Sequence, residues 1–160
     1  MRGLSLIIIL MLVAGCAHVI SDEMRARADE NTDLRVILKS PEAYIGRTVI
    51  LGGLIASSKN TDDGTFIEVL QKPLDSQGKP TSDDVSYGRF IIFNKGYLET
   101  NIYAAGRLVT VAGEITGTTE GKVGQMTYVY PIIKAEELRL HKEGDGGSRV
   151  RFSIGIWHAF

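Results

Sequence analysis

Apolar residues follow three different spacings along the chain. A mainly apolar run from Leu4 to Val13 comes first, and polar and charged residues from His18 to Asp33 follow it. Leu34, Ile37 and Leu38 then have the spacing of one helix face. Further along, apolar residues recur at every second position, which is typical of strands with one buried face. The pattern predicts a mainly β domain preceded by a short helix.

The alternating part of the chain divides into segments separated by turn residues. The predicted strands are Arg47–Ser58, Thr65–Lys72, Tyr87–Asn94, Arg107–Thr116 and Met126–Leu140. Asp33 is a suitable cap for the short helix, and Pro41 indicates a second helical start that ends at Gly46. We expect loops at residues 73–86 and 117–124, and Pro131 indicates an edge or a bend in the last strand.

One sequence pattern occurs twice. Residues 46–55 read GRTVILGGLI and residues 106–115 read GRLVTVAGEI, which share G-R-x-V-x-x-x-G-x-I. Glycine lacks the Cβ that would clash where a sheet coils, so Gly53 and Gly113 predict two bent strands. In the second copy we expect Val109 to point inward and Thr110 to point outward. One helix and five strands, with the first and fourth bent, favour a small five-stranded Greek-key barrel of the OB type. A β-sandwich is the alternative.

The start of the chain resembles a secretion signal. Arg2 precedes the apolar run, which is about ten residues long and therefore shorter than the roughly 20 residues of a spanning helix. Small residues and the chain's one cysteine follow, and Val13-Ala14-Gly15-Cys16 is similar to a bacterial lipobox. We expect residues 1–15 to be removed between Gly15 and Cys16. An ordinary secretion signal with an incidental cysteine, or a buried reduced cysteine, is the alternative.

Cys16 would carry a diacylglyceryl thioether and an N-acyl group, with chains such as palmitate. Each buried CH₂ contributes about 0.8 kcal/mol, so three long chains would hold the protein on a membrane. The residue after the cysteine is Ala17 rather than Asp, which favours the outer membrane by the Gram-negative sorting rule. Residues His18 to Asp33 show no clear apolar face, and we interpret residues 16–33 as a lipidated tether.

Composition excludes several classes of protein. The chain of 160 residues has 18 Lys and Arg against 19 Asp and Glu, so it is not a strongly basic nucleic-acid binder. A hydrophobic fraction of 44% is typical of a folded domain. One cysteine excludes an intramolecular disulfide framework and a Cys-based zinc site. We therefore expect no nucleic-acid partner.

An ordered set of motifs resembles the Slp (starvation lipoprotein) family. The motifs are Gly52-Gly53-Leu54-Ile55, Phe66-Ile67-Glu68-Val69-Leu70, Pro73-Leu74-Asp75, Gly78-Lys79-Pro80, Gly88-Arg89-Phe90, Tyr103, Gly106–Gly113 and Tyr128-Val129-Tyr130-Pro131. The resemblance covers about residues 34–141. It implies an outer-membrane lipoprotein of Gram-negative bacteria, some of whose members are induced on starvation, and it supplies no biochemical activity. Leu98-Glu99-Thr100 and Leu140-His141 depart from the family, which often has Leu-Asp-Pro and a following Trp there.

The sequence shows little that points to catalysis. His18, His141 and His158 lack the spacing of metal ligands, and the pairs Asp62-Asp63 and Asp83-Asp84 lie in predicted polar turns. The chain contains neither a G-x-S-x-G nucleophile motif nor a phosphate-binding P-loop. We therefore expect no enzyme activity, no metal and no cofactor.

The candidate ligand face follows from the predicted fold. OB barrels often bind ligands on strands two and three and in the loops after strands one and four. Phe66, Phe90 and Phe93 lie on these strands, and the loops contain Ser57–Asn60 and Thr118–Glu120. We expect these rings to belong to the core, with a face for an oligosaccharide or a peptide as the alternative.

The domain organisation predicted from these features is simple. Residues 34–142 form the OB-like barrel, residues 143–148 a Gly-rich linker, and residues 149–160 an apolar strand-like tail. We expect the tail, with Trp157 and Phe160, to dock on the protein itself rather than on a partner or a membrane surface. The expected role is structural or interactive, on the periplasmic face of the outer membrane, with an envelope protein or peptidoglycan as partner. A periplasmic ligand-binding module and an envelope hydrolase are the alternatives.

Overall fold

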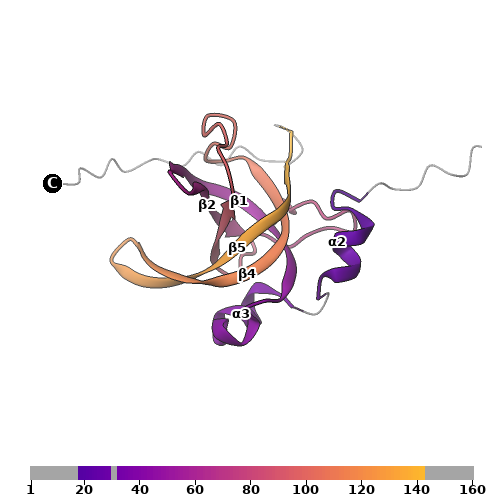
Figure 1. Ribbon diagram of the computed structural model, residues 1–160, viewed down its shortest axis with the longest axis horizontal. Coiled ribbons are helices and arrows are strands. Elements are labelled where there is room, and N and C mark those ends of the chain that lie inside the picture. Colours follow the sequence, from indigo (N-terminus) through magenta and orange to yellow (C-terminus); the bar gives the residue numbers. More distant parts are fainter. Residues whose placement is uncertain (1–17, 30–31, 143–160) are drawn as a thin grey trace, which may run out of the picture.

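The computed structural model describes residues 18–29 and 32–142. Within them, five strands form a closed barrel in the order β1-β2-β3-β5-β4. The strands are β1 (Thr48–Thr61), β2 (Gly64–Gln71), β3 (Arg89–Asn94), β4 (Leu108–Val123) and β5 (Met126–Leu140). The helical elements are α2 (Asp22–Arg27), α3 (Leu34–Lys39) and the 3₁₀ turn η1 (Pro41–Tyr44). Figure 1 shows α2 on one flank, and the β4–β5 hairpin extending on the opposite side.

The predicted mainly β, OB-like architecture is confirmed. Neighbouring strands pair antiparallel, except that β3 and β5 pair parallel through Ile91–Phe93 and Ile132–Lys134. A closed ring of this order is a five-stranded Greek-key barrel. The β-sandwich is therefore excluded.

The core lies inside the barrel and is closed at one end by α3. Val49, Val109 and Phe90 are among the inward side chains with no exposed surface. The Asp33 carboxylate caps α3 by accepting from the N–H groups of Arg35 and Val36, as the sequence predicts. With the helix beginning at this cap, Leu34 and Ile37 point into the same core cluster. The helix therefore closes this end of the barrel.

The mid-strand glycines have the function that the repeated pattern predicts. A Cβ on Gly53 would lie 2.0 Å from the carbonyl oxygen of Leu70 on β2. A Cβ on Gly113 would lie 2.1 Å from the carbonyl oxygen of Lys134 on β5. No side chain can occupy these positions without moving the neighbouring backbone, so glycine allows the strands to coil closely enough to close the barrel.

The prediction of a loop at residues 117–124 is wrong. β4 continues through this segment, and its pairing with β5 runs to Val123 opposite Met126, across a tight turn at Gly124 with φ 61°. The threonines there are exposed on a long hairpin, which satisfies backbone hydrogen bonds by pairing rather than by forming a loop. β1 likewise continues to Thr61, and β3 begins at Arg89 rather than at Tyr87.

Thr110 points outward as predicted, yet it has no exposed surface. The connection between β2 and β3 folds over this side of β4, and Leu74 forms an isolated bridge with Pro80. Thr110 Oγ1 donates to the carbonyl oxygen of Gly78 at 2.8 Å and lies 2.9 Å from His141 Nε2. The outer side of β4 where it pairs with β1, the β1–β4 seam, is therefore covered by this connection and forms a second, polar interior.

The prediction that residues 18–33 are a tether without an apolar face is wrong for the residues that the structure describes. Ser21 caps α2, and Ile20 and Met24 are 1% and 5% exposed. With Ala112 on β4 they form a separate small core. The spacing from Ile20 to Met24 is that of one helix face, but two apolar residues are too weak a signal to read as amphipathic. Residues 18–29 are therefore packed against the barrel.

The predicted signal, the linker at 143–148 and the tail at 149–160 lie outside the described residues. Within the residues that are described, no helix is long and apolar enough to cross a bilayer.

Candidate functional site

The outer face of β2 and β3 carries an aromatic pair. Phe66 and Phe93 lie opposite each other in the register of the two strands, with ring centroids 4.9 Å apart. Both rings are partly exposed. Phe90 lies on the same strand as Phe93 but points the other way, and it is 0% exposed in the core. Of the three rings expected in the core, strand alternation thus places Phe90 there and leaves Phe66 and Phe93 on the surface.

A polar cluster borders this pair. Glu68 lies on the outer face of β2, and its Oε1 atom accepts from Arg89 Nη1 at 2.7 Å and from the Tyr130 hydroxyl at 3.1 Å. The second oxygen, Oε2, accepts from Ser57 Oγ at 3.4 Å. Because four strands or strand ends supply these groups, the cluster exists only in the closed barrel.

Tyr130 is held in its protonated form. Its side chain is 4% exposed, and burial, together with the neighbouring Glu68 carboxylate, raises the pKa of Tyr130 to about 12. At neutral pH the phenol is therefore a hydrogen-bond donor rather than a base. Tyr128 packs edge-on against it with centroids 4.8 Å apart, and its hydroxyl accepts from the Arg89 N–H. The border of the aromatic pair is thus held together by hydrogen bonds and ring packing.

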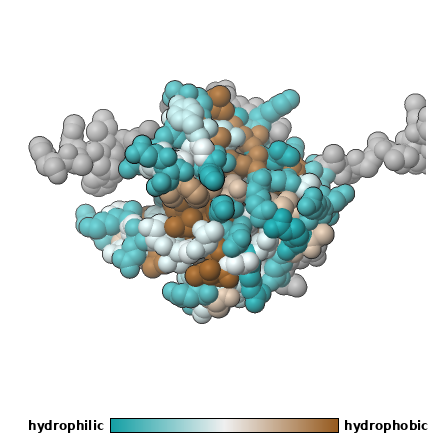
Figure 2. Space-filling model, in the orientation of Figure 1, coloured by the Kyte–Doolittle hydropathy of each residue, from teal (hydrophilic) through white to brown (hydrophobic). Residues whose placement is uncertain are grey.

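The remaining exposed apolar side chains are scattered. Figure 2 shows hydrophobic residues on one face of the molecule as separate areas among polar ones. Among the residues that the structure describes, the most exposed are Tyr97 and Met126, each 72% exposed, in different parts of the fold. The pair of Phe66 and Phe93, whose ring planes are tilted by 37°, differs from these because two rings in contact on neighbouring strands present one surface.

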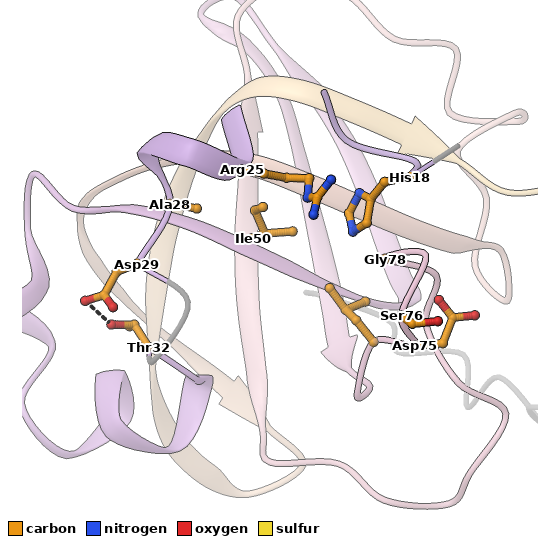
Figure 3. A pocket seen from close by; sticks show the side chains of 10 residues that line it. His18, Arg25, Ala28, Asp29, Thr32, Ile50, Asp75, Ser76 and Gly78 are labelled. Atoms are coloured by element: carbon orange, nitrogen blue, oxygen red, sulfur yellow. Dashed lines mark hydrogen bonds between the residues drawn. The ribbon is translucent and has the colours of Figure 1, made fainter. Parts of the chain in front are cut away.

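A pocket of about 340 Å³ lies on the opposite flank, over the outer side of β1. It is bounded by the start of the described chain, α2 and the loop after β2 (Figure 3). Its ionisable lining residues include His18, Arg25, Asp29 and Asp75. Arg25 pairs with Asp22, while Thr32 and Arg47 donate to Asp29. Backbone N–H groups, first that of Lys79 and then that of Gln77, hold the pKa of Asp75 below its usual range.

The chain next to this pocket is fastened to the barrel. Val19 N–H donates to the carbonyl oxygen of Gln77 at 2.9 Å, and Arg139 Nε donates to the carbonyl oxygen of Val19 at 3.1 Å. The Ser21 hydroxyl and N–H both donate to the Glu137 carboxylate, and the hydroxyl in particular lowers the pKa of Glu137. Arg27 adds a bidentate pair with Glu136.

The other residues that the sequence analysis considered as candidates lie at ordinary structural positions. His141 is buried and hydrogen-bonded, as expected of a histidine satisfied within the fold. The pairs Asp62-Asp63 and Asp83-Asp84 are exposed. Residues 18–29 and 32–142 bring together no group of three or more potential metal ligands. Cys16, Gly15 and His158 lie outside the described residues.

Sequence reasoning missed Glu68, Arg89 and Tyr130 as a unit. Tyr128 and Tyr130 alternate in the last strand, and Glu68 interrupts an apolar strand, which are weak signals by themselves. Their meeting depends on the parallel pairing of β3 with β5, which no local pattern contains.

The fold and these surfaces define a small OB-like barrel with an attached N-terminal segment. The chain matches the outer membrane lipoprotein Slp family over residues 13–153, a range that includes Cys16, and it belongs to this family.

Its relatives include the lipoprotein YeaY of Escherichia coli strain K12, which is 30% identical over 124 residues, covering 78% of this chain and 64% of YeaY. An uncharacterized protein of Haemophilus influenzae is 38% identical over 95 residues, covering 59% of this chain and 51% of that protein. The outer membrane protein Slp of E. coli strain K12 is 24% identical over 143 residues, covering 87% and 74%. The chain thus spans less than two thirds of the first two relatives.

Among solved structures, a small single-stranded DNA-binding protein from Streptomyces coelicolor aligns with a TM-score of 0.35 and 14% identity. The alignment covers 60% of this chain and 94% of that protein.

Proposed function

We propose that this protein is anchored through lipid on Cys16 at the periplasmic face of the outer membrane. The family match, which includes Cys16, and the sequence Val13-Ala14-Gly15-Cys16 support this proposal. Three acyl chains on one residue give an anchor that does not exchange with water. The barrel itself would then lie in the periplasm.

We propose further that the protein has no enzymatic activity and has a structural or interactive role in the envelope, under starvation or stress. The observation that carries this proposal is the partly exposed pair of Phe66 and Phe93 beside the Glu68 cluster. Both Glu68 oxygens accept hydrogen bonds, and the Tyr130 phenol keeps its proton. Such a fixed surface suits recognition of an envelope protein or of peptidoglycan better than proton transfer.

The anchor is tested by intact mass and membrane fractionation of the full chain in a Gram-negative host. The wild-type protein is expected as a cleaved, triacylated species in the outer membrane. Cys16→Ser is expected to remain uncleaved and to leave that membrane. An unlipidated wild-type protein in the soluble fraction would contradict the anchor.

The interactive role is tested by placing a photo-crosslinking amino acid at position 93. Ile45, which is 49% exposed at the end of η1, is the matched control position. A crosslinked envelope protein or peptidoglycan fragment is expected from position 93 and not from position 45. Turnover of an envelope substrate, with a pH dependence lost on changing an Asp or a His, would instead favour a hydrolase.

The second candidate function is a periplasmic ligand-binding module, which the outward pair of Phe66 and Phe93 favours. Aromatic faces pack against sugar rings and apolar peptide side chains, and each adds stabilising contact area. A thermal-shift screen with oligosaccharides and peptides should then find a stabilising compound. Phe93→Ala should abolish the shift, whereas Ile45→Ala should keep it.

A further inference from the structure

We propose that the barrel lies flush on the membrane surface, with the flank that carries His18 and the loop at residues 73–80 against the lipid headgroups. This inference rests on the proposed lipid anchor at Cys16. Instead of a domain held away from the membrane by a polar tether, the protein would have a domain with a fixed orientation on the membrane surface.

The first argument is the attachment of the chain at His18. The His18 ring covers Gly78 so closely that a Cβ on this glycine would lie 2.4 Å from the ring. His18 Nδ1 accepts from the Ile20 N–H at 3.1 Å, and Ile20 is 1% exposed. The hydrogen bonds of Val19 with Gln77 and Arg139 hold the same segment, residues 18–20, at two further points.

The second argument is chain length. Cys16 precedes His18 by two residues, and an extended residue spans at most about 3.6 Å, so the two Cα atoms lie within about 7 Å. A flexible segment of residues 16–33 would have separated anchor and barrel by about 20 Å on average. An anchor within about 7 Å of a fixed residue leaves the barrel no room to stand away from the bilayer.

The third argument is the chemistry of this flank. The pocket beside His18 is lined by basic and acidic side chains, among them Arg25 and Asp75 (Figure 3). Burying these charges in hydrocarbon would be costly, whereas phosphate and amine groups of phospholipids can pair with both signs. The flank is therefore suited to rest on headgroups rather than to insert.

The orientation determines what faces the periplasm. His18, α2 and the loop at 73–80 cover the outer side of the β1–β4 seam, where Ile20 packs with Ala112 and Gly78 accepts from Thr110. In the ring β1-β2-β3-β5-β4, strand β3 lies across the barrel from this seam. Phe93 on β3 therefore points away from the membrane, toward partners in the periplasm.

The experiment uses single-cysteine probes on the lipidated, full-length protein. The natural chain has one cysteine, and lipidation blocks it, so an introduced cysteine is the one free thiol. Ser76→Cys places a fluorophore on the exposed loop of the proposed contact flank. Met126→Cys is the matched control, because it is 72% exposed at the tip of the β4–β5 hairpin, on the side opposite α2 (Figure 1).

Both proteins are reconstituted in vesicles of phosphatidylethanolamine and phosphatidylglycerol that contain nitroxide-headgroup lipids. We expect several-fold stronger quenching at position 76 than at position 126. Equal quenching at both positions by a protein whose intact mass shows three acyl chains would overturn the flush orientation. An intact mass without acyl chains would overturn the anchor itself, so the two failures are distinguishable.

A variant that restores a tether sharpens the test. Insertion of a Gly/Ser segment of about ten residues after Ala17 leaves the contacts of His18 in place and adds roughly 17 Å of reach. Quenching at position 76 should then fall to the level at position 126, while thermal stability and acylation stay unchanged. Undiminished quenching would show that the contact does not depend on the short connection, and would contradict the chain-length argument.

Discussion

The two copies of the repeated pattern, residues 46–55 and 106–115, close the barrel in the same way. Gly46 and Gly106 have nearly equal φ values of 86° and 89°. Gly46 N–H donates to the carbonyl oxygen of Ile115, and Gly106 N–H donates to that of Ile55. Ile115 and Ile55 return the bond to the residues after the glycines, Arg47 and Arg107. The antiparallel copies are thus related by a local two-fold axis.

The copies differ on the outside of the barrel. Ile50 of the first copy and Ala112 of the second lie opposite each other and pack under α2. Gly52 and Thr110 form the next outward pair, which the loop at 73–80 covers. Inside the barrel, side chains of both copies pack in the same core. Outside, the copies pack against α2 and the loop at 73–80, and these two segments are not themselves repeated.

The comparison shows which part of a local pattern carries fold information. Positions that face the shared core repeat as Val49 with Val109 and Gly53 with Gly113. The residues at outward-facing positions do not repeat, because the segments that cover them do not repeat either. Substitutions at equivalent positions should therefore have equal effects inside and unequal effects outside.

The largest effect is expected at the mid-strand glycines. Gly53→Val and Gly113→Val each place a branched side chain where a Cβ already lies about 2 Å from a carbonyl oxygen, so each should lose about 4 kcal/mol or more and fail to fold at 37 °C or near it. Glu114→Val, exposed on the same strand, is the control. Thermal unfolding by circular dichroism measures the effect, and stability like that of the wild type in either glycine variant would contradict the strand bend.

A smaller and unequal effect is expected on the outer side. Thr110→Val removes the buried donor to Gly78, which should cost about 1–3 kcal/mol of unfolding free energy. At the equivalent position of the first copy, Ile50→Val should cost about 1 kcal/mol or less. Thr116→Val, exposed on β4, controls for a branched apolar side chain. Denaturant unfolding compares the three, and equal losses at 110 and 116 would contradict the polar interior.

An equal effect, smaller than that at Thr110, is expected at the entry glycines Gly46 and Gly106. A Cβ on Gly46 or Gly106 would meet nothing within 4 Å, so the cost of alanine is confined to the left-handed backbone conformation. Each substitution should lose about 1–2 kcal/mol. Denaturant midpoints of the two variants should agree, and a clear difference would break the two-fold relation of the copies.

The smallest effect concerns the covering of the second copy and its pH dependence. The pKa of Glu137 is below its ordinary value of 4.5, first because of the Ser21 hydroxyl. Because the pKa is lower in the folded state, the carboxylate stabilises the attachment at pH values above its ordinary pKa. This contribution is lost as the pH falls through the pKa of the folded state. The protection of the Ser21 amide against hydrogen exchange, corrected for intrinsic rate, should fall on acidification. Glu137→Gln should show weak protection at every pH; protection like that of the wild type would contradict the attachment.

Much of the fold could be predicted because it depends on local signals. The Asp33 cap, the alternation in the five strands and the bends at Gly53 and Gly113 all follow from steric or hydrogen-bonding needs of a few neighbouring residues. The continuation of β4 through residues 117–123 was missed because glycine and threonine suit a loop and an exposed strand equally. Pairing with β5 decided between them.

The candidate site was predicted only in part. Phe66 and Phe93 lie together on the outside of β2 and β3, whereas the sequence favours a core position for all three rings. Phe90 could not be separated from them without knowing which face of each strand is turned inward. Glu68 and Tyr130, which are 62 positions apart in the chain, meet because β3 pairs parallel with β5 beside β2.

Sequence alone was sufficient for the class of fold, the family resemblance and the expected anchor, since each depends on residues close together in the chain. The attachment of residues 18–29, the polar interior around Thr110 and the two opposite flanks emerged only in three dimensions. Two apolar residues such as Ile20 and Met24 gain stability only where the barrel offers Ala112 and Ile50 as partners. Long-range contacts of this kind depend on how strands close into a ring, and no window of sequence contains that information.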